Sequence, residues 1–113
     1  MMLSIFLIAS LSADFHLAGK TSAGLILCEN LNNKATLEKI KEYSKLYNEL
    51  NSYLSSELES NSDLSNRFYS AQVDFINSFE NADKDKSLDE SLLTTEKCQI
   101  HINKANQLIK KFQ

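Results

Sequence analysis

Apolar residues along this 113-residue chain recur with the period of an α-helix from about residue 34 to the end. The chain contains no proline, and its two glycines, Gly19 and Gly24, both lie in the N-terminal quarter. Because proline and glycine are the residues that most often interrupt helices, nothing after Gly24 breaks the pattern. No stretch of six residues keeps the alternation of a strand. The sequence therefore predicts an all-α fold.

Three helices are predicted within residues 34–113, the first over about 34–58 and the second over about 62–82. The third is expected to begin at a capping box, in which Ser87 and Glu90 each bond the other's free backbone N–H. The expected apolar stripes are Leu37, Ile40, Tyr43, Tyr47, Leu50, Leu54 and Leu58; Leu64, Phe68, Ala71 and Phe75; and Cys98, Ile102, Ala105, Ile109 and Phe112. Short connections favour an antiparallel bundle of these helices.

The first 13 residues carry no charge, and their apolar run from Leu3 to Leu11 is too short to span a bilayer, which takes about 20 residues. The run has the length of the apolar region of a secretory signal, and small residues follow it. We expect residues 1–13 to be a signal peptide that is cleaved after Ala13. Cleavage after Ala23, or an uncleaved buried start of an intracellular domain, are the alternatives. The first interpretation makes the protein periplasmic or secreted, without a transmembrane anchor.

Residues 14–33 are expected to form a short helix or an extended arm against the bundle domain of residues 34–113. This segment contains Cys28, and the third predicted helix contains Cys98; there are no other cysteines. In an oxidising compartment the pair predicts one disulfide, which would fix the arm to the third helix. In the cytosol both would be free, buried thiols. Zinc binding by Cys98 and His101 is a third interpretation, but zinc needs four ligands and few remain.

No pattern in the sequence indicates catalysis. Gly19-Lys20-Thr21 lacks the preceding glycine of a phosphate loop, no serine lies in a glycine-rich elbow, and His101 has no evident catalytic partner. The net charge of −3 argues against general binding of nucleic acid, which requires a basic face. We therefore predict a protein that is not an enzyme and that uses no cofactor and no metal ion.

Acidic residues are concentrated in the middle of the chain. Residues 57–96 contain ten acidic and three basic residues, whereas residues 97–113 contain four lysines and no acid. Such a region attracts a basic partner, mainly by speeding association. The candidate partner-binding residues are Asp83, Asp85, Asp89 and Glu90. The alternative is that these charges only complement helix dipoles and keep the protein soluble.

The segment from Leu46 to Glu80 resembles the N-terminal domain of LprI-type lysozyme inhibitors, a family of small exported bacterial helical domains. The resemblance is carried by Leu50-Asn51-Ser52-Tyr53, Leu64, Ala71-Gln72 and Phe75, which stands where the family has tryptophan. Two features depart from the family: Phe79-Glu80 replaces an Arg-Asp pair, and the cysteine expected soon after it is absent. The resemblance implies an exported, disulfide-bonded helical domain that, in some members, inhibits lysozyme.

Together these observations predict an exported, non-enzymatic binding domain that inhibits lysozyme or another cell-wall hydrolase by covering its substrate cleft. The predicted partner is basic. An interaction module of the cell envelope without a hydrolase target is the alternative function. Within the family-like block, Phe75 is expected to be buried between the second helix and the other two.

Overall fold

The computed structural model describes the backbone of residues 2–32, 35–83 and 94–113, and side chains from Leu11 onward except 80–83. These ranges contain four helices and no strand: α1 (Met2–Leu31), α2 (Leu37–Ser60), α3 (Ser62–Asp83) and α5 (Thr95–Phe112). The all-α prediction is confirmed. The predicted number of three helices is too low, because the segment 14–33 is also helical.

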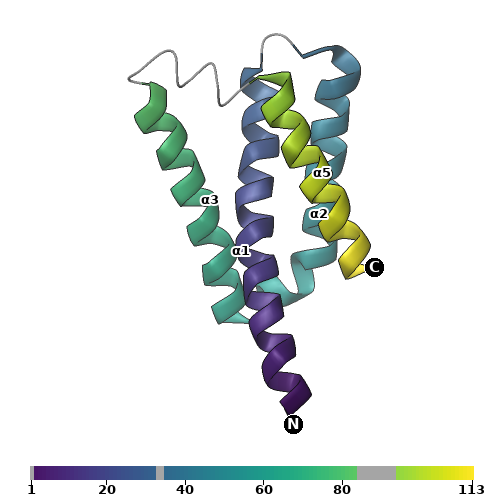
Figure 1. Cartoon of the computed structure of the whole chain (residues 1–113), viewed down its shortest axis with the longest axis vertical. Coiled ribbons are helices and arrows are strands. Elements are labelled where there is room, and N and C mark those ends of the chain that lie inside the picture. Colours follow the sequence, from purple (N-terminus) through teal and green to yellow (C-terminus); the bar gives the residue numbers. More distant parts are fainter. Residues whose placement is uncertain (1, 33–34, 84–93) are drawn as a thin grey trace.

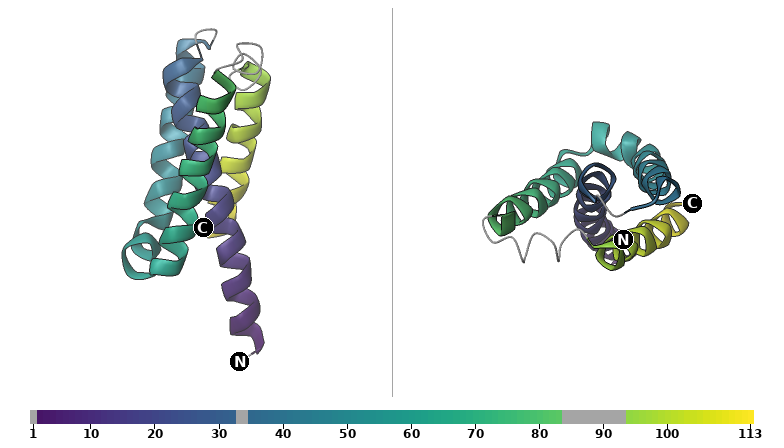
Figure 2. Two further views of the ribbon diagram at one scale, coloured as in Figure 1. Left: turned by 90° about the vertical axis from the view of Figure 1, so that its left-hand side faces the viewer. Right: turned by 90° about the horizontal axis from the view of Figure 1, so that it is seen from above.

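Helix α1 lies in the middle of the bundle and contacts each of the other three described helices (Figure 1). Helix α2 contacts both α3 and α5, but no Cα atom of α3 lies within 8 Å of a Cα atom of α5 in the described residues. Seen from above, α3 and α5 therefore lie on opposite sides of α1 (Figure 2).

The N-terminal segment is the central helix of the fold, so the alternative of an extended arm is wrong. Phe15, Ala18, Ser22, Ala23 and Gly24 are all buried, and these positions lie on several sides of the helix. A helix that is covered on several sides shows no single apolar stripe. Gly19 and Gly24 let α3 and α5 approach α1 closely. The helix also extends past the end of the bundle at its N-terminus (Figure 2).

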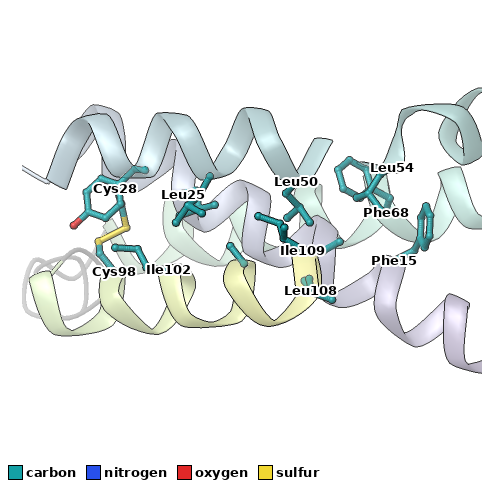
Figure 3. Packing of buried hydrophobic residues seen from close by; sticks show 14 of the residues in the cluster. Phe15, Leu25, Cys28, Leu50, Leu54, Phe68, Cys98, Ile102, Leu108 and Ile109 are labelled. Carbon is teal, nitrogen blue, oxygen red and sulfur yellow. A yellow bond between two sulfur atoms is a disulfide. The ribbon is translucent and has the colours of Figure 1, made fainter. Parts of the chain in front are cut away.

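The core lies where α1 meets the other helices (Figure 3). Tyr43, Leu50 and Leu54 of α2 are completely buried. The remaining buried members of the predicted stripes are Leu64, Phe68, Ala71, Cys98, Ile102, Ala105 and Ile109. The position of Leu37 was predicted wrongly: it lies in the first turn of α2, beyond the reach of the neighbouring helices, and is 66% exposed.

Threonine side chains cap two of the helices. The Oγ1 atoms of Thr36 and Thr94 accept hydrogen bonds of 3.2 Å from the backbone N–H groups of Lys39 and Lys97, at the starts of α2 and α5. Each bond satisfies a donor that has no partner within the helix. The described part of the last helix thus begins at Thr95, and the predicted capping box of Ser87 and Glu90 lies outside the described residues.

Candidate functional site

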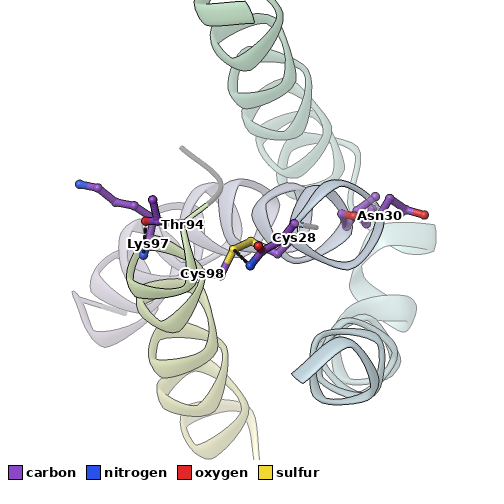
Figure 4. The surroundings of a disulfide bond; sticks show 7 residues. Cys28, Asn30, Thr94, Lys97 and Cys98 are labelled. Atoms are coloured by element: carbon purple, nitrogen blue, oxygen red, sulfur yellow. Dashed lines mark hydrogen bonds between the residues drawn. A yellow bond between two sulfur atoms is a disulfide. The ribbon is translucent and has the colours of Figure 1, made fainter. Parts of the chain in front are cut away.

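A disulfide between Cys28 and Cys98 joins the C-terminal end of α1 to the first turn of α5 (Figure 4). Both residues are buried, their Cα atoms are 6.0 Å apart, and the amide Nδ2 of Asn32 donates to Sγ of Cys98 at 3.7 Å. The structure thus contains the cysteine pair that the sequence suggested. A disulfide sulfur is neither a nucleophile nor a thiolate ligand, so the zinc interpretation loses Cys98.

An open groove of about 760 Å³ runs between the N-terminal half of α1 and one side of α3, and reaches the end of α2. We call it the α1–α3 groove. Its lining residues are Leu11, Ser12, His16, Glu57, Asn61, Asp63, Leu64, Asn66, Arg67, Ser70 and Asp74. A volume of this size lies within the usual range for binding pockets, about 300–1,000 Å³.

Helical periodicity places the groove residues of α3 along one wall. Asp63, Arg67, Ser70 and Asp74 follow one another at steps of four, three and four residues, so they share a face of α3. On α1, Ser12 and His16 are four residues apart and form part of the opposite wall. The groove is therefore built on two regular helices.

Asn61 lies at the end of the groove where α2 is followed by α3. Its backbone N–H donates to the carbonyl of Glu57 at 2.8 Å, which ends α2. Its side-chain Oδ1 accepts from the N–H of Leu64 at 3.2 Å, which caps the start of α3. One residue thus terminates one helix and begins the next, and it fixes the first groove residues of α3 relative to α2.

The α1–α3 groove is more acidic than basic. It contains the carboxylates of Glu57, Asp63 and Asp74 and the guanidinium of Arg67. None of these four side chains forms an ion pair or hydrogen bond with another described residue. Leu64 is buried beneath them and gives the groove an apolar floor. The arrangement is suited to binding a charged group with an apolar stem.

His101 of α5 contacts Phe75 of α3 beside Gly24 of α1. The two rings are nearly perpendicular, with centroids 5.4 Å apart, and the imidazole lies against Gly24. Burial, together with the positive charges of Lys104 and Lys20, lowers the pKa of His101 to about 4. His101 Nδ1 is buried without a hydrogen bond to a described atom. This histidine is therefore neutral at pH 7, and the described residues provide no carboxylate partner of the kind that assists catalysis.

The family-like residues fall into two groups in the structure. Leu50 and Ala71 are buried, as expected for core residues, whereas Gln72 and Phe75 are only half-buried. The predicted full burial of Phe75 is wrong: its ring contacts that of His101 of α5, but the backbones of α3 and α5 do not come close enough to enclose it. Phe75 covers the edge of His101 and keeps part of its surface in contact with solvent.

The structure does not place the predicted acidic footprint. Asp83 is the last residue of α3, and its side chain is outside the described part; Asp85, Asp89 and Glu90 lie outside the described residues altogether. The sequence reasoning missed the α1–α3 groove. The available signal was the set of polar residues at helical spacing from Asp63 to Asp74, which lie on the flank of the apolar stripe of α3.

The described residues show neither a metal cluster nor a membrane-spanning helix. They contain no group of three or more His, Cys, Asp or Glu side chains that could hold a metal ion. None of the helices in the described part of the chain combines the length and apolar character that are needed to cross a membrane.

Comparison of the chain with protein-family models, with curated proteins and with solved structures finds no match.

Proposed function

We propose that this protein is an exported, disulfide-stabilised domain that binds another protein and does not act as an enzyme. The observation that carries the proposal is the α1–α3 groove: an open, charged groove on a rigid scaffold, whose ionisable side chains make no ion pair or hydrogen bond with described residues. Catalytic sites usually contain an acid, base or nucleophile that a neighbouring group orients. The described lining has no such pair, which favours binding.

Export is supported by two independent features. The apolar, uncharged N-terminal segment has the character of a secretory signal. The buried Cys28–Cys98 disulfide is typical of an oxidising compartment, such as the periplasm or the exterior of the cell. A disulfide that holds two helices together also suits a small domain, whose core alone provides limited stability.

Within this class, we propose inhibition of lysozyme or another cell-wall hydrolase. The sequence resemblance suggests the target, and the acidic groove suggests how the domain meets it. Electrostatic attraction between an acidic surface and a basic enzyme speeds association and weakens as salt is added. Bound in this way, the rigid bundle would cover the substrate cleft of the enzyme.

An activity assay tests this function directly. Purified protein with its disulfide intact is titrated into lysozyme acting on cell-wall substrate, at low and at physiological salt. We expect inhibition that saturates with the protein and weakens as salt rises. Unchanged lysozyme activity at a large excess of the protein would contradict the inhibitor function and favour the envelope interaction module.

A further inference from the structure

We propose that the α1–α3 groove binds a short, extended segment of a protein partner that carries two basic side chains, with Asp63 and Asp74 as their anionic contacts. This inference rests on the proposed binding function and names the chemistry of the partner. It also moves the footprint from residues 83–90 to the wall of α3.

The length of the groove fits such a segment. Asp63 and Asp74 are three helical turns apart on one face of α3, which corresponds to about 16 Å along the helix axis at 1.5 Å per residue. An extended chain covers this distance with about five residues. The groove, of about 760 Å³, has room for a few residues and is too small for a folded element.

The chemistry of the groove favours lysine or arginine in that segment. Both side chains have long apolar stems that pack on apolar surface while the charged end reaches a polar group. Leu64 provides that surface at the base of the groove. The two carboxylates stand at either end of the wall, and Glu57 adds a third anionic group near Asp63.

Arg67 limits what the groove accepts. It lies between Asp63 and Asp74 on the same wall, and neither it nor the two aspartates has an ion pair with a described residue. A run of consecutive basic residues would place a like charge opposite this guanidinium, which is unfavourable. The preferred segment therefore has its basic residues at the ends and a neutral or acidic residue between them.

A titration followed by NMR tests the site without a known partner. The ¹⁵N-labelled protein is mixed with the blocked peptide Ala-Lys-Ala-Ser-Ala-Lys-Ala, whose two lysines point to the same face of an extended chain. It is mixed separately with the same peptide carrying Glu in both Lys positions. We expect the basic peptide to shift the backbone amides of His16 and of residues 63–74, and the acidic peptide to leave them unchanged. Equal shifts with both peptides, shifts located elsewhere, or no shifts at millimolar peptide would overturn the proposal.

Two charge-reversal variants, one inside the groove and one outside it, test whether the groove is the binding site. D63K/D74K should weaken binding of the basic peptide at least tenfold. The control variant E38K/E59K makes the same change in net charge at exposed positions outside the groove. Glu38 lies in the first turn of its helix, as Asp63 does. This control variant should bind the peptide like the parent. Circular dichroism checks that both variants are folded. Undiminished binding by D63K/D74K would show that the groove is not the site.

The two proposals fail in different ways. Groove-specific peptide binding without lysozyme inhibition would reject the hydrolase target and keep the groove. Lysozyme inhibition that D63K/D74K leaves unchanged would keep the function and reject the groove.

Discussion

The imidazole of His101 in α5 lies directly against Gly24 in α1: a Cβ atom at position 24 would stand 2.5 Å from both Cε1 and Nδ1 of the ring. The other glycine of the chain, Gly19, makes a similar close approach to α3, where a Cβ atom would overlap the backbone carbonyl of Phe68. Each glycine thus lets a different helix come close to α1. A Cβ atom would meet a side chain at position 24 and the backbone of α3 at position 19.

Because of this difference, the two glycines should tolerate replacement by alanine to different degrees. In the interior of a free helix, replacing glycine by alanine gains about 1 kcal/mol. Gly19→Ala should nevertheless lower the free energy of unfolding by about 1–3 kcal/mol, because α3 has to move away. Gly24→Ala should be nearly neutral, because the His101 ring can turn aside. Urea unfolding of both variants measures this, and a Gly19→Ala protein more stable than the parent would show that the helices separate easily.

Acid should destabilise the protein through His101. Its pKa falls from the ordinary 6.5 to about 4 on folding, so the unfolded chain binds the proton first as pH decreases. The stabilisation is complete above pH 6.5 and is lost between pH 6.5 and about 4, by about 3 kcal/mol in total. Unfolding free energies measured across this range should fall less steeply for His101→Asn than for the parent. His16→Asn, at an exposed position, is the matched control and should follow the parent.

Removing the disulfide should cost the bundle much of its stability. Cys28 and Cys98 are 70 residues apart, and closing a loop of that length stabilises a protein by about 4 kcal/mol in the chain-entropy model. The double variant C28A/C98A should lose about 2–5 kcal/mol in chemical unfolding. The parent measured in a strong reductant should lose a similar amount. Peptide mapping without reductant that recovers two free thiols would contradict the premise.

The two phenylalanines of α3 should differ in their contribution to stability. Phe68 is 1% exposed and lies in the core, so Phe68→Ala should cost about 3–5 kcal/mol. Phe75 is half-buried against His101, so Phe75→Ala leaves less of a cavity and should cost about 1–2 kcal/mol. Equal losses measured by thermal unfolding would mean that α3 packs more tightly against α5 than the structure shows.

Export should leave a protein that begins at or after Asp14. Helix α1 continues through Ala13 without a break, and its first turns extend past the bundle (Figure 2). Asp14 itself is paired with Lys111 of α5 at 3.0 Å, so cleavage after Ala13 would keep this contact. Mass spectrometry of the protein from its native host should find this start. A cytosolic form that retains Met1 would contradict the export proposal.

Local signals were sufficient for three of the described helices. The apolar stripes of α2, α3 and α5 correctly indicated the buried Leu50, Phe68 and Ile102, because each of these helices is covered mainly on one side. The boundary between α2 and α3 was also predicted closely, since polar residues around Asn61 interrupt both stripes and can cap a helix. A chain with two cysteines can form only one internal disulfide. The pairing of Cys28 with Cys98 therefore followed as soon as an oxidising compartment was assumed.

The sequence by itself therefore determined the helical class, the core faces of the outer helices and the cysteine pair. The tertiary structure decided the central place of α1, the partial exposure of Phe75 and the α1–α3 groove. Small residues such as Ala18 and Ser22 form no apolar stripe, and their burial follows only from neighbours that approach on several sides. The groove brings together residues about 50 positions apart, such as His16 and Arg67, because two helices lie side by side. Periodicity shows which face of a helix is buried, but not which helix will cover it.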